Sequence, residues 1–258
     1  MDNLNFAHFA LSRQPSSGAA TCYDRSFSLV HLSLKSSARM PNPKRPRKPT
    51  NKGDAESRLA SPVRIIGGTF RGRTLEYQGD PRTRPMKDRV REAVYNLLGP
   101  VTGAHVIDLF AGTGALALEA ISRGAISADA VEKHFPTADV LKKNVQSLAP
   151  DAAFNVRAGD AFYWATRLAA PVDRPWIVFC SPPYVLYVDR KDDMLLMIAD
   201  MVRQAPNGSQ IVVECDERFD PFDLPRAAQW SVRTYPPAII AILRVGEGDS
   251  EPSSDEDA

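Results

Sequence analysis

The segment between residues 106 and 124 predicts a strand, a glycine loop and a helix in direct succession. Residues 106–110 form a nearly continuous apolar run, which is typical of a strand buried on both faces. Gly112 and Gly114 then lead into a predicted helix over 115–123, which has small or apolar side chains at helical spacing and ends at Gly124. Glycines at such a turn let a ligand come close to the backbone at the helix N-terminus. The segment therefore predicts a ligand site in an α/β fold.

Two kinds of ligand bind at turns of this form. Gly112, Gly114 and Ala117, with Glu132 twenty positions after Gly112, match the pattern of dinucleotide-binding proteins. Asp108 argues against a dinucleotide, because a carboxylate beside the loop would repel a pyrophosphate. It suits instead a ligand that carries an ammonium and a sulfonium group, such as S-adenosylmethionine. A glycine turn that serves only packing is the third alternative.

Strands and helices alternate along residues 63–245, which we predict to form one domain that begins with a small hairpin at 63–76. Further strands are predicted at 106–110, 129–132, 153–157, 176–180, 210–215, 230–235 and 238–245, and helices at 86–98, 115–123, 137–148, 161–168 and 192–204. The alternation predicts a mixed, mainly parallel seven-stranded sheet with helices on both faces. The last two strands have no helix between them, so we expect them to form an antiparallel hairpin.

Both ends of the chain predict disorder. Residues 1–62 form a basic extension rich in serine and proline, and residues 246–258 form a tail with six acids and no base. Residues 39–91 contain fifteen lysines or arginines against five acids, which favours a polyanionic partner. The first 38 residues superficially resemble a transit peptide, and Met40 is an alternative start. We favour disorder, from either start, over targeting.

The composition argues against membrane proteins and metalloproteins. No run approaches the roughly 18 apolar residues of a membrane span. Three cysteines (Cys22, Cys180 and Cys215) have no paired spacing, and only four histidines are present, so we expect neither a disulfide framework nor a bound metal. This cysteine usage favours a reducing compartment, and we expect a cytoplasmic protein.

Polar residues follow the first four predicted strands. Asp108 ends the first strand, Glu132 the second, and Asp160 and Ser181 follow the third and fourth. Because ligands bind beyond the carboxyl ends of the strands in open sheets, we expect these side chains to lie close together. Glu132 can accept from both ribose hydroxyls of an adenosine, and Asp160 can accept from an adenine amino group. Each acid alone is typical of a solvated strand end, but four in order favour a site.

The sequence Ser181-Pro-Pro-Tyr184 ends the fourth predicted strand. Prolines cannot donate backbone hydrogen bonds, so the carbonyl groups here stay available to accept from a substrate amino group. Tyr184 offers a ring on which a base can stack. The alternative is a proline turn that only ends the strand.

At these residues the chain resembles a known family. DLFAGTGAL at residues 108–116, followed by SPPY at a strand end, is similar to class I S-adenosylmethionine-dependent methyltransferases that modify exocyclic amino groups. RIIGGxxRGRxL at residues 64–75, followed by RPxxDRVRE at 84–92, resembles the bacterial RsmD-like enzymes, which methylate N2 of a guanine in 16S ribosomal RNA. The resemblance covers about residues 63–245 and leaves both tails outside.

The resemblance implies a Rossmann-like methyltransferase fold, S-adenosylmethionine as the cofactor and ribosomal RNA as the partner, in an immature small subunit. It also implies a monomer that does not bind membranes. The implied catalytic residues are Ser181, Pro182, Pro183 and Tyr184. The implied cofactor-binding residues are Asp108, Phe110, Gly112, Gly114, Glu132, Lys133, Asp160 and Ala161. The implied RNA-binding residues are Arg64, Arg71, Arg73, Arg84 and Arg89.

One departure from the family pattern bears on the target base. The family usually has Asp where this chain has Ser181, and Ser-Pro-Pro-Tyr is more typical of enzymes that methylate N4 of cytosine. Guanine N2 in RNA is therefore our expectation, and cytosine N4 or adenine N6 in DNA or RNA is the alternative. We expect Ser181→Asp to retain or raise guanine methylation, because a carboxylate would accept the amino protons with a full charge.

Three other classes of function are compatible with parts of the chain. They are a NAD-dependent oxidoreductase, a methyltransferase acting on a protein amide, and a non-catalytic RNA-binding module. Asp108 and residues 181–184 argue against the first class, and the basic arm and hairpin favour nucleic acid over protein. Binding of labelled S-adenosylmethionine, followed by a transfer assay, separates an enzyme from a binding module.

Overall fold

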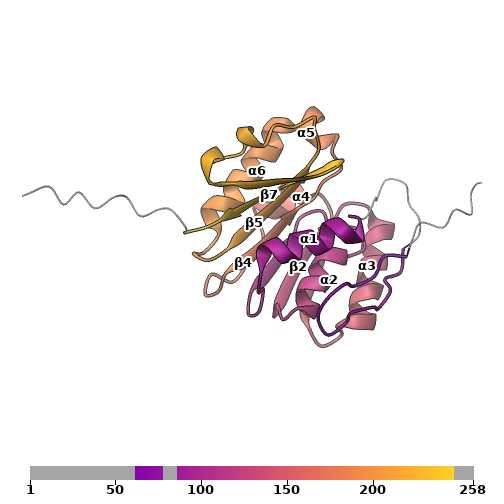
Figure 1. Ribbon diagram of the computed structural model, residues 1–258. Coiled ribbons are helices and arrows are strands. Elements are labelled where there is room, and N and C mark those ends of the chain that lie inside the picture. Colours follow the sequence, from indigo (N-terminus) through magenta and orange to yellow (C-terminus); the bar gives the residue numbers. More distant parts are fainter. Residues whose placement is uncertain (1–61, 78–85, 247–258) are drawn as a thin grey trace, which may run out of the picture. The chain divides into compact units, whose positions relative to one another are not determined.

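The computed structural model describes residues 62–77 and 86–246 (Figure 1). The predicted N-terminal extension and acidic tail, apart from Pro62 and Gly246, lie outside the described residues. Residues 78–85 also lie outside them. Within the described ranges, no helix has the length and apolar character of a membrane span.

In the part of the chain that the structure describes, seven strands form one mixed sheet in the order β3-β2-β1-β4-β5-β7-β6. Strands β3, β2, β1, β4 and β5 are parallel to their neighbours, and β7 is antiparallel to both β5 and β6. The strands are β1 His105–Asp108, β2 Ser127–Glu132, β3 Ala153–Ala158, β4 Trp176–Cys180, β5 Gln210–Cys215, β6 Ser231–Tyr235 and β7 Ala238–Arg244. The predicted mixed sheet with a C-terminal antiparallel hairpin is confirmed.

Helices cover both faces of this sheet, as predicted (Figure 1). They are α1 Asp88–Leu98, α2 Ala115–Ser122, α3 Phe135–Leu148, α4 Ala161–Ala165, α5 Leu186–Asp189 and α6 Lys191–Gln204, and two short 3-10 helices, η2 Pro221–Asp223 and η3 Ala227–Gln229, precede β6. The prediction for α4 was three residues too long. The N–H groups of Arg167 and Leu168 both donate to the carbonyl of Trp164, so the last turn tightens and the helix ends.

Successive side chains of a strand pack on opposite faces of the sheet. Val106 packs in the core formed with α1 and α2, whereas its neighbour Ile107 packs in the core formed with α6. All residues of β1, β4 and β5 are buried, which explains why their sequences are apolar runs and not alternating patterns. The polar residues buried within these strands are His105, Asp108, Gln210 and Glu214, and the two acids are discussed below.

The predicted hairpin at 63–76 is a short antiparallel pairing of Arg64 with Thr74. Its turn lies against the C-terminus of α2, where the Thr69 N–H donates to the carbonyl of Ser122 over 2.8 Å. Gly68 has a φ of 75°, and a Cβ atom at this position would lie 1.9 Å from that carbonyl oxygen. The contact therefore requires glycine at position 68.

A buried carboxylate, Glu119 of α2, joins the hairpin to the helices. It accepts hydrogen bonds from the backbone N–H groups of Ile66 and Gly67, at 3.2 and 3.1 Å. It also pairs with Arg91 of α1 at 3.0 Å and with Arg123 at 2.7 Å. Glu119 and Arg91 are both fully buried. The sequence predicted the hairpin and the helices but not this group that connects them.

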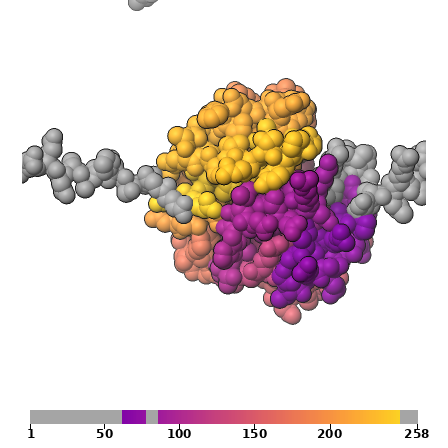
Figure 2. Space-filling view, in the orientation of Figure 1, coloured from indigo at the N-terminus to yellow at the C-terminus, as the bar shows by residue number. Residues whose placement is uncertain are grey.

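The C-terminal strands lie directly beside α1 (Figure 2). The Gln210 side chain donates to the carbonyl of Leu98 over 3.1 Å, and Arg244 donates to the carbonyl of Leu97 over 2.9 Å. These bonds occupy carbonyl groups that have no partner within the last turn of a helix. The helix ends at Gly99, as predicted, with a φ of 75°.

Candidate active site

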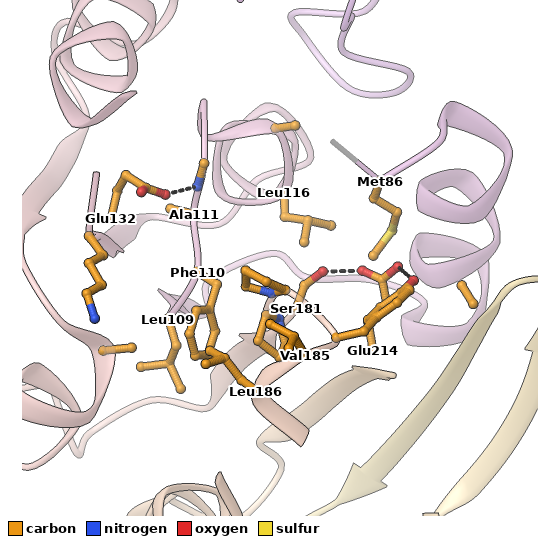
Figure 3. A pocket seen from close by; sticks show the side chains of 18 of the residues that line it. Met86, Leu109, Phe110, Ala111, Leu116, Glu132, Ser181, Val185, Leu186 and Glu214 are labelled. Carbon is orange, nitrogen blue, oxygen red and sulfur yellow. Dashed lines mark hydrogen bonds between the residues drawn. The ribbon is translucent and has the colours of Figure 1, made fainter. Parts of the chain in front are cut away.

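A pocket with a volume of about 760 Å³ opens at the carboxyl ends of β1, β2, β4 and β5 (Figure 3). Ligands are expected at this edge of an open α/β sheet. The β6–β7 turn, residues 235–238, and the start of α1 also contribute to its wall. Of the predicted cofactor-binding and catalytic residues, those in the pocket lining are Phe110, Gly112, Glu132, Lys133, Asp160, Ala161, Ser181, Pro182, Pro183 and Tyr184.

Glu132 is held in the pocket wall by two backbone groups. One carboxylate oxygen accepts from the Gly112 N–H over 2.9 Å, and the other accepts from the His134 N–H over 2.7 Å. Gly112 has a φ of 54°, in the left-handed region, and this conformation turns its N–H toward Glu132. An ionised carboxylate has about four acceptor positions, so Glu132 retains the capacity to accept from a diol.

An aromatic pair and an acid form the next part of the wall. Phe110 and Phe162 meet edge to face with ring centroids 6.5 Å apart, and the Arg190 guanidinium lies 3.8 Å above the centre of the Phe162 ring. Asp160 accepts from the Phe162 N–H over 2.9 Å and from the Lys133 ammonium over 2.8 Å. Burial alone would raise the pKa of Asp160, but these two donors hold it below its usual value. Asp160 is therefore anionic at neutral pH.

Asp108 and Gly114 are not in the pocket lining, contrary to the prediction. Asp108 is fully buried, and neither of its carboxylate oxygens forms a hydrogen bond of good geometry among the described residues. Burial raises the pKa of Asp108 to about 7, although the nearby N–H groups of Phe110 and Ala117 oppose part of the rise. Gly114 has a φ of 88°, and a Cβ atom there would lie 2.3 Å from the Leu141 side chain. Gly114 therefore allows α2 and α3 to pack closely.

Residues 181–184, which follow β4, form another part of the pocket wall. The Ser181 hydroxyl donates a hydrogen bond to one oxygen of Glu214, and the Tyr184 hydroxyl donates to the other oxygen over 2.7 Å (Figure 3). Burial and the Glu214 carboxylate both raise the pKa of Tyr184, so its hydroxyl remains protonated. Tyr184 is consequently held in one orientation beside the pocket.

Glu214 was missed by our sequence reasoning. It is the second-last residue of β5, is only 8% exposed and lines the pocket. The signal was present in the sequence, because Glu214 is an acid at the end of an otherwise apolar strand. The rule that we applied to the first four strands would have identified it on the fifth.

Four of the five arginines predicted to bind RNA are described by the structure, and these four lie outside the pocket lining. Arg71 and Arg73 are exposed on the hairpin, and Arg89 is exposed on α1. Arg64 is exposed and forms an ion pair with Asp88 at 3.2 Å. Arg84 lies outside the described residues. Val90, which follows Arg89 in α1, lines the pocket. The same helix therefore carries both a pocket residue and an exposed arginine.

The model of a protein family described as Conserved hypothetical protein 95 matches residues 63–235. The chain belongs to this family. The match includes the hairpin, the glycine loop and residues 181–184, and the resemblance to RsmD-like proteins inferred from these motifs is confirmed. Because the match ends at residue 235, it covers the sheet up to the end of β6.

Several bacterial proteins are similar to this family member. Ribosomal RNA small subunit methyltransferase D of Escherichia coli strain K12 is 38% identical over 139 residues, which are 54% of this chain and 65% of that protein. The match thus spans just under two thirds of that relative. Putative rRNA methyltransferase YlbH of Bacillus subtilis is 32% identical over 160 residues, 61% of this chain and 85% of that protein. The solved structure of the putative methyltransferase yhhF from Escherichia coli is 31% identical, with a TM-score of 0.56, over 70% of this chain and 96% of that one.

Proposed function

We propose that this protein is an S-adenosylmethionine-dependent methyltransferase that transfers a methyl group to N2 of a guanine in small-subunit ribosomal RNA. The observation that carries the proposal is the single pocket that combines Glu132 and the glycine loop with residues 181–184. The names of the relatives support the substrate class, since the Escherichia coli protein is named a ribosomal RNA small subunit methyltransferase and the Bacillus subtilis protein a putative rRNA methyltransferase. An immature small subunit as the substrate and a monomeric enzyme are part of the same proposal.

The pocket residues suit the adenosine half of S-adenosylmethionine. Glu132 can accept from the ribose hydroxyls, and Phe110 and Phe162 offer an apolar wall for adenine beside the acceptor Asp160. Asp108 is buried outside the pocket lining, so the proposal does not use it to separate this cofactor from a dinucleotide. The acceptor groups of residues 181–184 favour the methyl donor, because they suit an amino group that is positioned to receive a methyl group.

The chain contributes positioning to the reaction. The Tyr184 ring provides a stacking face for a base flipped out of the RNA. The Pro182 carbonyl and the Ser181 hydroxyl accept from its amino group and hold the nitrogen in line with the methyl group. When bound, S-adenosylmethionine supplies a sulfonium methyl group, whose S–C bond breaks as the new C–N bond forms, with the electron pair leaving on sulfur. No strong general base is needed, because the alkylated nitrogen becomes acidic and loses its proton to water.

A methylation assay with nucleoside analysis tests the proposal. The purified protein is incubated with labelled S-adenosylmethionine and either immature small subunits or naked 16S RNA. We expect label in N2-methylguanosine. Label in N4-methylcytidine would support the alternative suggested by Ser181, and no transfer together with tight NAD binding would contradict the proposal. Cytosine is the second candidate only because Ser181 stands where the family usually has Asp.

Replacing Glu132 with alanine should weaken the binding of S-adenosylmethionine by roughly 10- to 150-fold, or about 1.5 to 3 kcal/mol, because charge-assisted hydrogen bonds to the ribose are lost. Isothermal titration calorimetry measures the change. Glu217→Ala, which removes an exposed carboxylate outside the pocket lining, is the matched control and should bind normally. Equal affinities of the two variants would exclude Glu132 as a ribose ligand.

Removing Arg71 and Arg73 together should reduce the salt dependence of RNA binding. Each phosphate contact contributes about 0.7 to 0.9 to the slope of log K against log salt concentration, so the double alanine variant should lose up to about twice that amount. Fluorescence anisotropy at several salt concentrations measures the slope. Arg203→Ala, on the opposite face of the sheet, is the control. An unchanged slope would show that the hairpin does not contact phosphates.

A further inference from the structure

Glu214 is a carboxylate that forms hydrogen bonds with two of the four residues predicted to be catalytic, Ser181 and Tyr184. One of its oxygens accepts from the Ser181 hydroxyl and the other accepts from the Tyr184 hydroxyl at 2.7 Å. Its own side chain reaches the pocket from β5, whereas the other two residues follow β4 (Figure 3). Hydrogen bonds across neighbouring strands therefore connect three residues of the pocket wall.

This arrangement determines the polarity of the Ser181 hydroxyl. A serine hydroxyl has one proton to donate and two lone pairs that accept. Because the proton is donated to Glu214, only lone pairs remain for a group inside the pocket. A neutral hydroxyl without such a partner rotates and can serve a substrate as donor or acceptor. Ser181 in this protein can serve only as an acceptor.

We infer that Glu214 is a positioning residue that fixes Ser181 as the acceptor for the amino group of the target base, and so makes the site specific for an exocyclic amino group. The inference rests on the proposed function. A base edge with an N–H₂ group meets lone pairs that accept its proton, whereas a carbonyl at the same place meets lone pairs that repel it. The hydrogen bond to a carboxylate also increases the electron density on the Ser181 oxygen and strengthens its acceptance.

The hydrogen bond from Ser181 to Glu214 also determines which groups keep their protons during the methyl transfer. Ser181 keeps its proton throughout, because its role is to accept a hydrogen bond from the substrate nitrogen and not to remove the proton. The C–N bond forms as the S–C bond breaks, and the nitrogen then releases one proton to water. Glu214 remains a carboxylate and exchanges no proton with the base.

Glu214 changes our expectation for Ser181→Asp. A second carboxylate would lie within hydrogen-bonding reach of Glu214, and two carboxylates at this distance cannot both stay ionised without cost. We therefore expect the single variant to be impaired. In a Glu214→Gln background, however, an aspartate at 181 has no charged neighbour at that place and can accept directly from the amino group.

The experiment compares Glu214→Gln, Ser181→Ala, the combination of both, and Glu214→Gln with Ser181→Asp. Steady-state methylation gives kcat and KM for small subunits, calorimetry gives the affinity for S-adenosylmethionine, and thermal melting reports folding. Glu217→Gln is the matched control, since this exposed side chain lies three residues further along the chain.

We expect Glu214→Gln to lower kcat by about 10- to 100-fold, as for a lost charge-assisted hydrogen bond, with unchanged cofactor affinity and little change in KM. The combination with Ser181→Ala should be no slower than Ser181→Ala alone, because the glutamine amide oxygen can still accept from Tyr184 and the lost effect of Glu214 acts through Ser181. Ser181→Asp should restore most of the activity of Glu214→Gln.

Three outcomes would overturn the inference while leaving the proposed function intact: full activity of Glu214→Gln, multiplicative effects of the two substitutions, or no rescue by Ser181→Asp in a folded variant that binds the cofactor. A wild-type protein that transfers no methyl group to any RNA would overturn the proposed function itself, and the inference with it.

Discussion

Glu119→Ala is expected to lower the free energy of unfolding by about 3 to 5 kcal/mol, because it removes the central member of a buried charge network. Arg91 is fully buried, would lose its buried partner at 3.0 Å and would keep Asp88, a 40% exposed carboxylate at 3.0 Å. The backbone N–H groups of Ile66 and Gly67 would lose their acceptor as well. A loss of this size is a large part of the roughly 5 to 15 kcal/mol that stabilises an ordinary domain.

Urea unfolding followed by circular dichroism measures this loss. Glu92→Ala, which removes an exposed glutamate from α1, is the matched control and should stay within about 0.5 kcal/mol of the wild type. Glu119→Gln keeps the shape of the side chain and removes only its charge, so it should fall between the two. A Glu119→Ala protein as stable as the control would show that the network contributes nothing to folding.

Asp108→Asn is expected to remove a pH dependence of stability that amounts to about 4 kcal/mol. Burial raises the pKa of Asp108 from 3.8 to about 7 in the folded protein. Below the lower value the carboxyl is neutral in both states. As pH rises from there to about 7, the unfolded chain ionises while the folded protein retains the proton, so stability falls. Above pH 7 both states are ionised, and the full cost of the buried charge is present.

The measurement is the difference in unfolding free energy between the variant and the wild type, at several values of pH between 4 and 8. Other titrating groups contribute equally to both proteins and cancel. The variant should gain stability relative to the wild type as pH rises, and most of the gain should occur below pH 7. Asp151→Asn, at an exposed site, is the control. A constant difference across this range would contradict a protonated Asp108.

The central strands of the sheet were predictable from the sequence, because a strand buried on both faces is a nearly continuous apolar run. The predicted bounds of β4 and β5 agree with the structure. The bounds of α4 were less accurate, because hydrogen bonds to a single carbonyl, that of Trp164, end the helix without a glycine or proline. The antiparallel hairpin could be predicted from the absence of a helix between its strands.

The positions of site residues could be predicted from strand ends, but their directions could not. Asp108 and Glu132 both end strands, yet one points into the core and the other into the pocket wall. A short strand covered on both faces has no polar side that would indicate where its last side chain points. The partners of Glu214 lie 33 and 30 residues away in the chain, and Glu119 accepts from backbone groups 53 and 52 residues away, so periodicity does not identify such pairs.

The hydrogen bonds from Gln210 and Arg244 to the end of α1 have a consequence for the order of synthesis. The two bonds span 112 and 147 residues, so α1 emerges from the ribosome long before its last carbonyl groups can obtain these partners. The pocket likewise needs the β6–β7 turn for its wall. A nascent chain that ends before β6 contains Gln210 but lacks both Arg244 and this turn, and contacts of such long range slow folding. The binding site can therefore be complete only after the β6–β7 turn has left the ribosome.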